Sequence, residues 1–139
     1  MATIKSYTDL EQSKALAEFL PIESADMCFA NDGTSIKIDA NPYNARKLMW
    51  KDVQLIPCWS LAALLDVLPV DWWGFNRHYF LEISKMGDVS TPYEVRYYRF
   101  REQSDGADFS RITHVSYQAD NPVDACYEMI IKLHELNLL

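Results

Sequence analysis

The sequence has few glycines, four among 139 residues, and only three cysteines, which lie far apart. So little glycine, with six prolines, excludes a collagen-like or low-complexity chain. An odd number of cysteines without close spacing is not a disulfide framework, and no CxxC pair is present to bind a metal ion. Free thiols are typical of a reducing compartment, so we expect a cytoplasmic protein.

The sequence also lacks long hydrophobic runs and an excess of basic charge. No apolar run approaches the roughly 20 residues that span a membrane, and the first residues, MATIKSYTDLEQSK, contain no signal-peptide core. Thirteen Lys and Arg against 20 Asp and Glu give a net charge of -7. An acidic chain is repelled by phosphate backbones and by anionic lipids. We therefore expect neither nucleic acid nor a membrane to be the partner.

What the sequence does contain is typical of a globular protein. Hydrophobic residues make up 49% of the chain and charged residues 24%, which excludes an intrinsically disordered chain. A length of 139 residues predicts a single domain over 1–139. A chain of this length buries enough surface to fold without a metal ion or a disulfide.

Three segments have the polar caps and the apolar spacing of helices. Thr8 and Glu11 fit a capping box, in which each side chain satisfies a free backbone N–H of the first turn. Ser60 and Asn121 are also N-cap residues, and a proline after Asn121 suits the first helical turn. The expected helices span 8–20, 61–68 and the residues after 121, the last with a buried stripe of Val123, Cys126, Ile130 and Leu133.

Other segments are rich in the aromatic and β-branched residues typical of strands. Expected strands over 26–30 and 35–39 flank Asn31-Asp32-Gly33, a hairpin signal because these residues tolerate positive φ. Residues 40–57 have no clear pattern, and residues 70–76 are expected to form a loop. A three-strand meander is expected over 79–86, 93–101 and 112–119.

The alternation of side chains sets a register for this meander. Pairing Leu81 with Tyr97 and Ile83 with Val95 gathers the apolar residues on one face, which helices must cover. The two helices with the strongest apolar stripes, at 61–68 and after residue 121, are the expected cover. The sequence therefore predicts an α+β fold: a mainly antiparallel sheet of about five strands with helices packed on one face.

The opposite face of the meander carries the candidate acid–base groups. The same alternation places Glu82, Arg96 and His114 together there, with Phe80 and Tyr98 beside them. Opposite charges across strands ordinarily stabilise a solvent-facing sheet surface, which is the alternative to a chemical role. If this protein is an enzyme, this cluster is where we expect its acid–base chemistry.

Two ten-residue segments carry a family resemblance. Residues 56–65, IPCWSLAALL, resemble the IPxWSLxxLL pattern of small uncharacterised proteins found on prophages and other mobile elements, often in gut Bacteroidetes. Residues 121–130, NPVDACYEMI, resemble the NPxDAxxEMI ending of the same proteins. The resemblance implies a phage or mobile-element origin and a host cytoplasm. It implies no activity, cofactor or functional residue.

No motif for metal or nucleophilic chemistry is complete. The three histidines, His78, His114 and His134, share no ligand spacing. Cys58 is the best candidate for a reactive thiol, because it precedes a helix start that could lower its pKa, although buried packing explains it equally well. We therefore expect no catalytic residue, no metal ion and no cofactor.

Two sets of residues are candidates for binding. Trp72, Trp73 and Phe75 surround a glycine in the expected loop, and tryptophan is enriched at protein interfaces. They could instead fold back over the end of the sheet. The leading hypothesis is thus a non-enzymatic module that binds another protein, which could also be a second copy of this chain.

The alternative hypothesis is a protein that binds single-stranded nucleic acid. Residues 93–101, YEVRYYRFR, interleave bases with aromatic rings, a pattern that can stack nucleobases and neutralise phosphates through residues such as Arg96 and Tyr98. Two facts oppose it. Side-chain alternation sends only part of this stripe to one face, and the chain is acidic overall.

Overall fold

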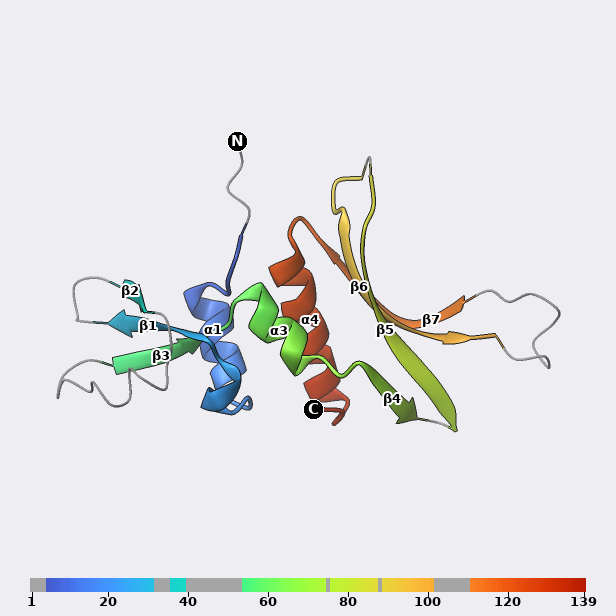
Figure 1. Cartoon of the computed structure of the whole chain (residues 1–139), viewed down its shortest axis with the longest axis horizontal. Coiled ribbons are helices and arrows are strands. Elements are labelled where there is room, and N and C mark those ends of the chain that lie inside the picture. Colours follow the sequence, from blue (N-terminus) through green and yellow to red (C-terminus); the bar gives the residue numbers. More distant parts are fainter. Residues whose placement is uncertain (1–4, 32–35, 40–53, 75, 88, 102–110) are drawn as a thin grey trace. The chain divides into compact units, whose positions relative to one another are not determined.

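The structure is a computed structural model that describes residues 5–31, 36–39, 54–74, 76–87, 89–101 and 111–139 (Figure 1). The chain divides into two compact units, Met1–Val67 and Leu68–Leu139, and each contains an antiparallel sheet with a helix packed against it. This confirms the predicted α+β class. The single domain expected over 1–139 stays a prediction.

The first unit has a three-stranded sheet of order β2-β1-β3, with the first helix packed against β3. Its elements are α1 (Leu10–Ala17), the 3-10 turn η1 (Ile22–Ser24), β1 (Met27–Asn31), β2 (Ile36–Asp39), β3 (Gln54–Cys58) and α3 (Leu61–Val67).

The pairing of β1 with β2 confirms the predicted hairpin, with Asn31 opposite Ile36. The turn itself, residues 32–35, lies outside the described residues. Strand β3 comes from the segment for which no pattern was found, and it pairs with the other edge of β1, with Cys58 opposite Met27. The sheet therefore has one strand more than the predicted hairpin.

Helix α1 begins later than predicted, and its cap is a different residue. The Asp9 carboxylate accepts from the Gln12 backbone N–H at 2.9 Å, and the Gln12 side chain accepts from the Asp9 N–H at 3.2 Å. The capping box predicted at Thr8 and Glu11 is thus wrong by one residue. Thr8 is fully buried instead, and its hydroxyl accepts from the Trp59 N–H at 3.1 Å. The Thr8 side chain is therefore not available to cap the helix, and Asp9 takes this position because aspartate is as good an N-cap residue as threonine.

The second unit has a four-stranded antiparallel sheet of order β4-β5-β6-β7, and α4 packs against β6 and β7 (Figure 1). Asn121 caps α4 as predicted, by accepting from the Asp124 N–H at 2.9 Å. The elements are β4 (Asp71–Gly74), β5 (Arg77–Lys85), β6 (Tyr93–Phe100), β7 (Arg111–Ala119) and α4 (Pro122–Glu135).

The predicted register between β5 and β6 is confirmed. Leu81 lies opposite Tyr97 and Ile83 opposite Val95. Val95 and Tyr97 are fully buried, as is the predicted stripe of α4. We call the face that carries Val95 and Tyr97 the inner face, and the opposite one the outer face. The cover expected from the helix at 61–68 stays a prediction.

A β-bulge in β7 interrupts the predicted alternation. Val115 lies opposite Tyr97, but the next pair is Thr113 opposite Tyr98, so His114 is an extra residue on β7. A bulge reverses which face each following residue occupies. The residues of β7 before His114 are therefore on the faces opposite to those that simple alternation predicts.

Candidate binding surface

The segment expected to be an aromatic loop is an edge strand, and this separates its two tryptophans. In β4, Trp72 lies opposite Tyr79 and Trp73 opposite His78. Because neighbouring side chains of a strand point to opposite faces, Trp72 turns inward and stacks on Tyr79 at 4.2 Å, whereas Trp73 turns outward and is 71% exposed. The predicted loop over 70–76 is wrong, because β5 begins earlier than predicted and offers an edge to which this segment pairs.

The inner-face aromatic cluster includes His114, which corrects its predicted position. The His114 ring lies 4.7 Å from the ring of Tyr79 and 5.4 Å from that of Trp72, both inner-face residues. The bulge places it there, so the prediction that His114 shares a face with Glu82 and Arg96 is wrong. No Glu82/His114 acid–base pair is therefore formed.

The outer face presents a row of aromatic rings that crosses three strands. Trp73 stacks on His78 at 4.3 Å, and His78 lies 4.3 Å from Phe80. The row continues onto β6, where Phe100 is 5.7 Å and Tyr98 6.0 Å from Phe80. Phe75, the remaining predicted aromatic residue, lies outside the described residues.

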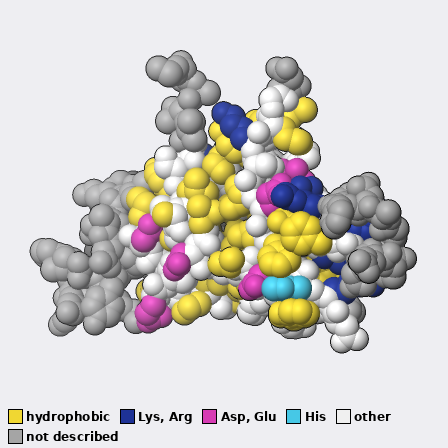
Figure 2. All heavy atoms as spheres, turned by 45° about the vertical axis from the view of Figure 1, so that its right-hand side comes forward, with side chains coloured by type: hydrophobic (Ala, Val, Ile, Leu, Met, Phe, Trp, Pro, Cys, Tyr) yellow, Lys and Arg dark blue, Asp and Glu magenta, His cyan; other side chains and the backbone are white. Residues whose placement is uncertain are grey.

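Two arginines complete this row on the same face. The Arg111 guanidinium lies 4.7 Å from the centre of the Tyr98 ring, and that of Arg96 lies 5.6 Å from it. In Figure 2, hydrophobic, basic, acidic and histidine side chains adjoin on one side of the molecule. We call this surface the aromatic–arginine face; it comprises Trp73, His78, Phe80, Arg96, Tyr98, Phe100 and Arg111.

Glu82 organises the charges on this face. One of its carboxylate oxygens accepts from two Arg96 nitrogens, at 2.7 and 3.1 Å, and the other accepts from Arg111. Arg96 also donates to the Thr113 hydroxyl at 3.2 Å. Both carboxylate oxygens of Glu82 thus accept hydrogen bonds from guanidinium groups, which holds the two arginines side by side.

The sequence analysis named neither His78 nor Arg111 as a candidate residue of this face. Arg111 lies before the start of the predicted strand, and simple alternation would have put it on the inner face. The bulge at His114 turns it outward, opposite Phe100. A pattern of alternating residues carries no signal for such a bulge.

Basic charge is concentrated on this sheet. The four strands carry five basic and three acidic side chains, although the whole chain has a net charge of -7. The outer face itself carries Arg96 and Arg111 together with the carboxylates of Glu82, Glu94 and Asp71, and the Asp71 carboxylate lies 2.7 Å from His78. The surface thus combines exposed rings with two guanidinium groups, the chemistry that recognises planar groups attached to anions.

Cys58 does not have the environment of a reactive thiol. It is fully buried, and burial raises the pKa of its thiol. Its Sγ donates to the Thr8 carbonyl at 3.4 Å. The expectation that a helix start could lower this pKa is therefore wrong, because desolvation outweighs it.

Comparison with known proteins finds no family model, curated protein or solved structure that matches this chain. The resemblance to prophage proteins stays a prediction. Among the described residues, no helix is long and apolar enough to cross a membrane. In the same residues, no three His, Cys, Asp or Glu side chains are grouped so that they could hold a metal ion.

Proposed function

We propose that this protein binds single-stranded nucleic acid on its aromatic–arginine face and acts without catalysis. One observation carries the proposal: exposed aromatic rings and two guanidinium groups occupy the same face of one sheet. Direct cross-strand pairs put them there, with Trp73 opposite His78 and Phe100 opposite Arg111.

The rings on this face have the exposure that stacking requires. Trp73 is 71% and Phe100 is 52% exposed, at opposite ends of the row. Nucleobases stack on such rings whatever their sequence, with about 1–3 kcal/mol per base. Side-chain alternation sends only part of the 93–101 stripe to the outer face. Rings from β4 and β5 lie beside that part, so the outer face still has enough aromatic rings for several bases.

The local charge supports the same ligand. A guanidinium group has five N–H donors, so Arg96 and Arg111 can each bind Glu82 and still donate to a phosphate oxygen. Acidic groups farther than about 8 Å from the face are largely screened at physiological salt. We expect weak binding, with a dissociation constant on the order of 10–100 µM, within the range of non-specific complexes.

The leading alternative is a protein partner on the same face. Trp and Arg are the residues that dominate protein interfaces, and the exposed indole of Trp73 favours such a partner. Nucleic acid is the better candidate because the rings form a row along which successive bases could stack, with cations beside it.

The test is fluorescence anisotropy with a labelled oligothymidine of about 12 nucleotides, compared with a duplex of equal length. We expect the single strand to bind more tightly and the binding to weaken as salt rises from roughly 25 to 200 mM. Two phosphate contacts predict a slope of about -1.4 in a plot of log K against log salt.

Substitutions on the aromatic–arginine face, each with a control substitution on α4 or at its end, test whether the oligonucleotide binds there. Arg111→Ala should weaken binding about 3–10-fold and reduce the salt slope, whereas Lys132→Ala on α4 should not. Phe100→Ala should weaken binding about 5–10-fold, whereas Leu136→Ala, which removes a similarly exposed apolar side chain, should not. Lack of binding at the lowest salt, or equal losses in the control variants, overturns the proposal and leaves a protein partner as the function to test.

A further inference from the structure

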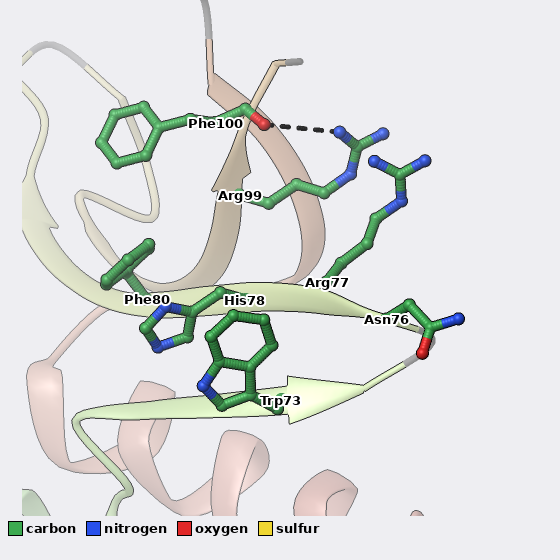
Figure 3. A pocket seen from close by; sticks show the side chains of 7 residues that line it. All are labelled: Trp73, Asn76, Arg77, His78, Phe80, Arg99 and Phe100. Atoms are coloured by element: carbon green, nitrogen blue, oxygen red, sulfur yellow. Dashed lines mark hydrogen bonds between the residues drawn. The ribbon is translucent and has the colours of Figure 1, made fainter. Parts of the chain in front are cut away.

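A pocket lies at one end of the aromatic–arginine face. It has a volume of about 240 Å³ and is lined by seven residues (Figure 3). This is smaller than the cavities of about 300–1,000 Å³ that hold drug-sized ligands, so it fits one end group and not a length of chain. The lining residues are Trp73, Asn76, Arg77, His78, Phe80, Arg99 and Phe100.

One side of this pocket is aromatic. The rings of Trp73, His78 and Phe80 follow one another along β4 and β5, with ring centres 4.3 Å apart at each step. Phe100, from the end of β6, adds a fourth ring. Such a wall accepts a planar ring by stacking.

The other side of the pocket is cationic. Continuing the β5–β6 register past Phe80 and Tyr98 puts Arg99 opposite Tyr79, so Arg77 and Arg99 project from the same face of adjacent strands. Figure 3 shows their guanidinium groups near each other, on the side of the pocket away from the rings. Arg99 donates to the Phe100 carbonyl at 3.4 Å, and its guanidinium retains further N–H donors. Two neighbouring guanidinium groups favour an anion of more than one charge.

The rings and the guanidinium groups come from opposite faces of the sheet and meet at its end. Asn76, in the left-handed conformation at φ 60°, makes the turn between β4 and β5 at this point. A ligand that contacts both sides must pass round the end of the sheet. The end of a chain can do this, because no further nucleotides have to follow it.

We infer that this pocket binds a nucleoside phosphate monoester, with its base against the rings and its phosphate on Arg77 and Arg99, as the terminal nucleotide of a bound strand. The inference rests on the proposed function. A terminal monoester carries about -1.5 to -2 charges at neutral pH, whereas each internal diester carries one. The pair of arginines therefore distinguishes a phosphorylated end from an internal phosphate and from a hydroxyl end.

The test compares internally labelled oligothymidines that differ only in their ends: 5′-phosphate, 3′-phosphate or hydroxyl at both ends. We expect one of the phosphorylated strands to bind about 3–10-fold more tightly than the hydroxyl strand. Arg77→Ala and Arg99→Ala should each abolish this preference while changing binding of the hydroxyl strand less than about twofold. Lys85→Ala removes a cation from the other end of β5 and should leave the preference intact.

Competition between thymidine monophosphate and the labelled strands shows whether the pocket binds the end of a strand or a free nucleotide. If all strands bind equally and with the expected salt dependence, the inference is wrong and the proposed function stands. If the mononucleotide binds through Arg77 and Arg99 but no strand does, the pocket is confirmed and the proposed function is wrong. If neither binds, both are wrong.

Discussion

Tyr97 and Cys126 are the two buried ionisable residues that face each other between the sheet and α4. Both are fully buried, and the Tyr97 hydroxyl donates to the Pro69 carbonyl at 2.6 Å. Burial raises the pKa of Cys126 from its ordinary 9.0 to about 12. Burial also raises the pKa of Tyr97, and a thiolate at Cys126 would raise it further. The folded protein therefore keeps two protons that an unfolded chain releases at alkaline pH.

This predicts a loss of stability as the pH rises. Above pH 9.0, the ordinary pKa of the thiol, the unfolded chain binds fewer protons than the folded one, so the free energy of unfolding falls until the folded pKa is reached. Each such group contributes up to about 1.4 kcal/mol per pH unit. In urea denaturation between about pH 8 and 10.5, Cys126→Ala should lose less stability than the unchanged protein. Parallel pH profiles would contradict a protonated, buried Cys126.

The position of strand β4 depends on one glycine. A Cβ atom added to Gly74 would clash with the six-membered ring of Trp72, whose Cε3 would lie 3.0 Å away. The ring cannot move easily, because it is stacked on Tyr79 and lies edge-on to Tyr97. Nothing lies within 4 Å of the equivalent atom at Gly87, between β5 and β6.

Gly74→Ala should therefore destabilise the protein by about 1–3 kcal/mol, the usual effect of overpacking. Gly87→Ala is the matched control and should change stability by no more than about 0.5 kcal/mol. Urea denaturation followed by tryptophan fluorescence measures both. Equal stabilities of the two variants would show that Trp72 does not fix β4 to the sheet.

The elements also show what sequence patterns can and cannot predict. The cap at Asn121, the stripe of α4 and the pairing of Leu81 with Tyr97 follow from local spacing and alternation, and all are confirmed. The β4 strand and the bulge at His114 depend on pairing with a neighbouring strand, β5 in the first case and β6 in the second. A short segment such as 71–74 becomes a strand because a neighbouring edge is available, and no property of its own residues requires it.

The composition of the candidate site could be predicted only in part, for the same reason. Glu82, Arg96 and Tyr98 were predicted on one face, and the β5–β6 register places them together. Arg111 replaces His114 beside them, because one extra residue in β7 reverses the alternation. The resulting face has a second guanidinium group in place of an imidazole, which favours binding of an anion over acid–base chemistry.

The net charge of -7 on the complete chain opposes binding of nucleic acid, whereas Arg96 and Arg111 on the aromatic–arginine face favour it. The two effects differ in range. Long-range repulsion depends on every charge, but exposed charges more than about 8 Å away are screened at physiological salt. Binding should therefore follow the few charges on the face and depend little on the total.

Two substitutions with the same effect on total charge test this. Glu82→Gln and Glu128→Gln each remove one negative charge, the first beside Arg96 and Arg111, the second from the exposed side of α4. At about 150 mM salt, Glu82→Gln should tighten oligothymidine binding about 3-fold and steepen its salt dependence, because it releases both guanidinium groups towards phosphates. Glu128→Gln should change affinity by less than about 1.5-fold.

The loss of stability in Glu82→Gln should stay within about 1 kcal/mol, because the ion pairs are partly exposed. Equal tightening in both variants would mean that total charge governs the affinity, and weaker binding in Glu82→Gln would mean that the arginines must be held by Glu82 to bind at all.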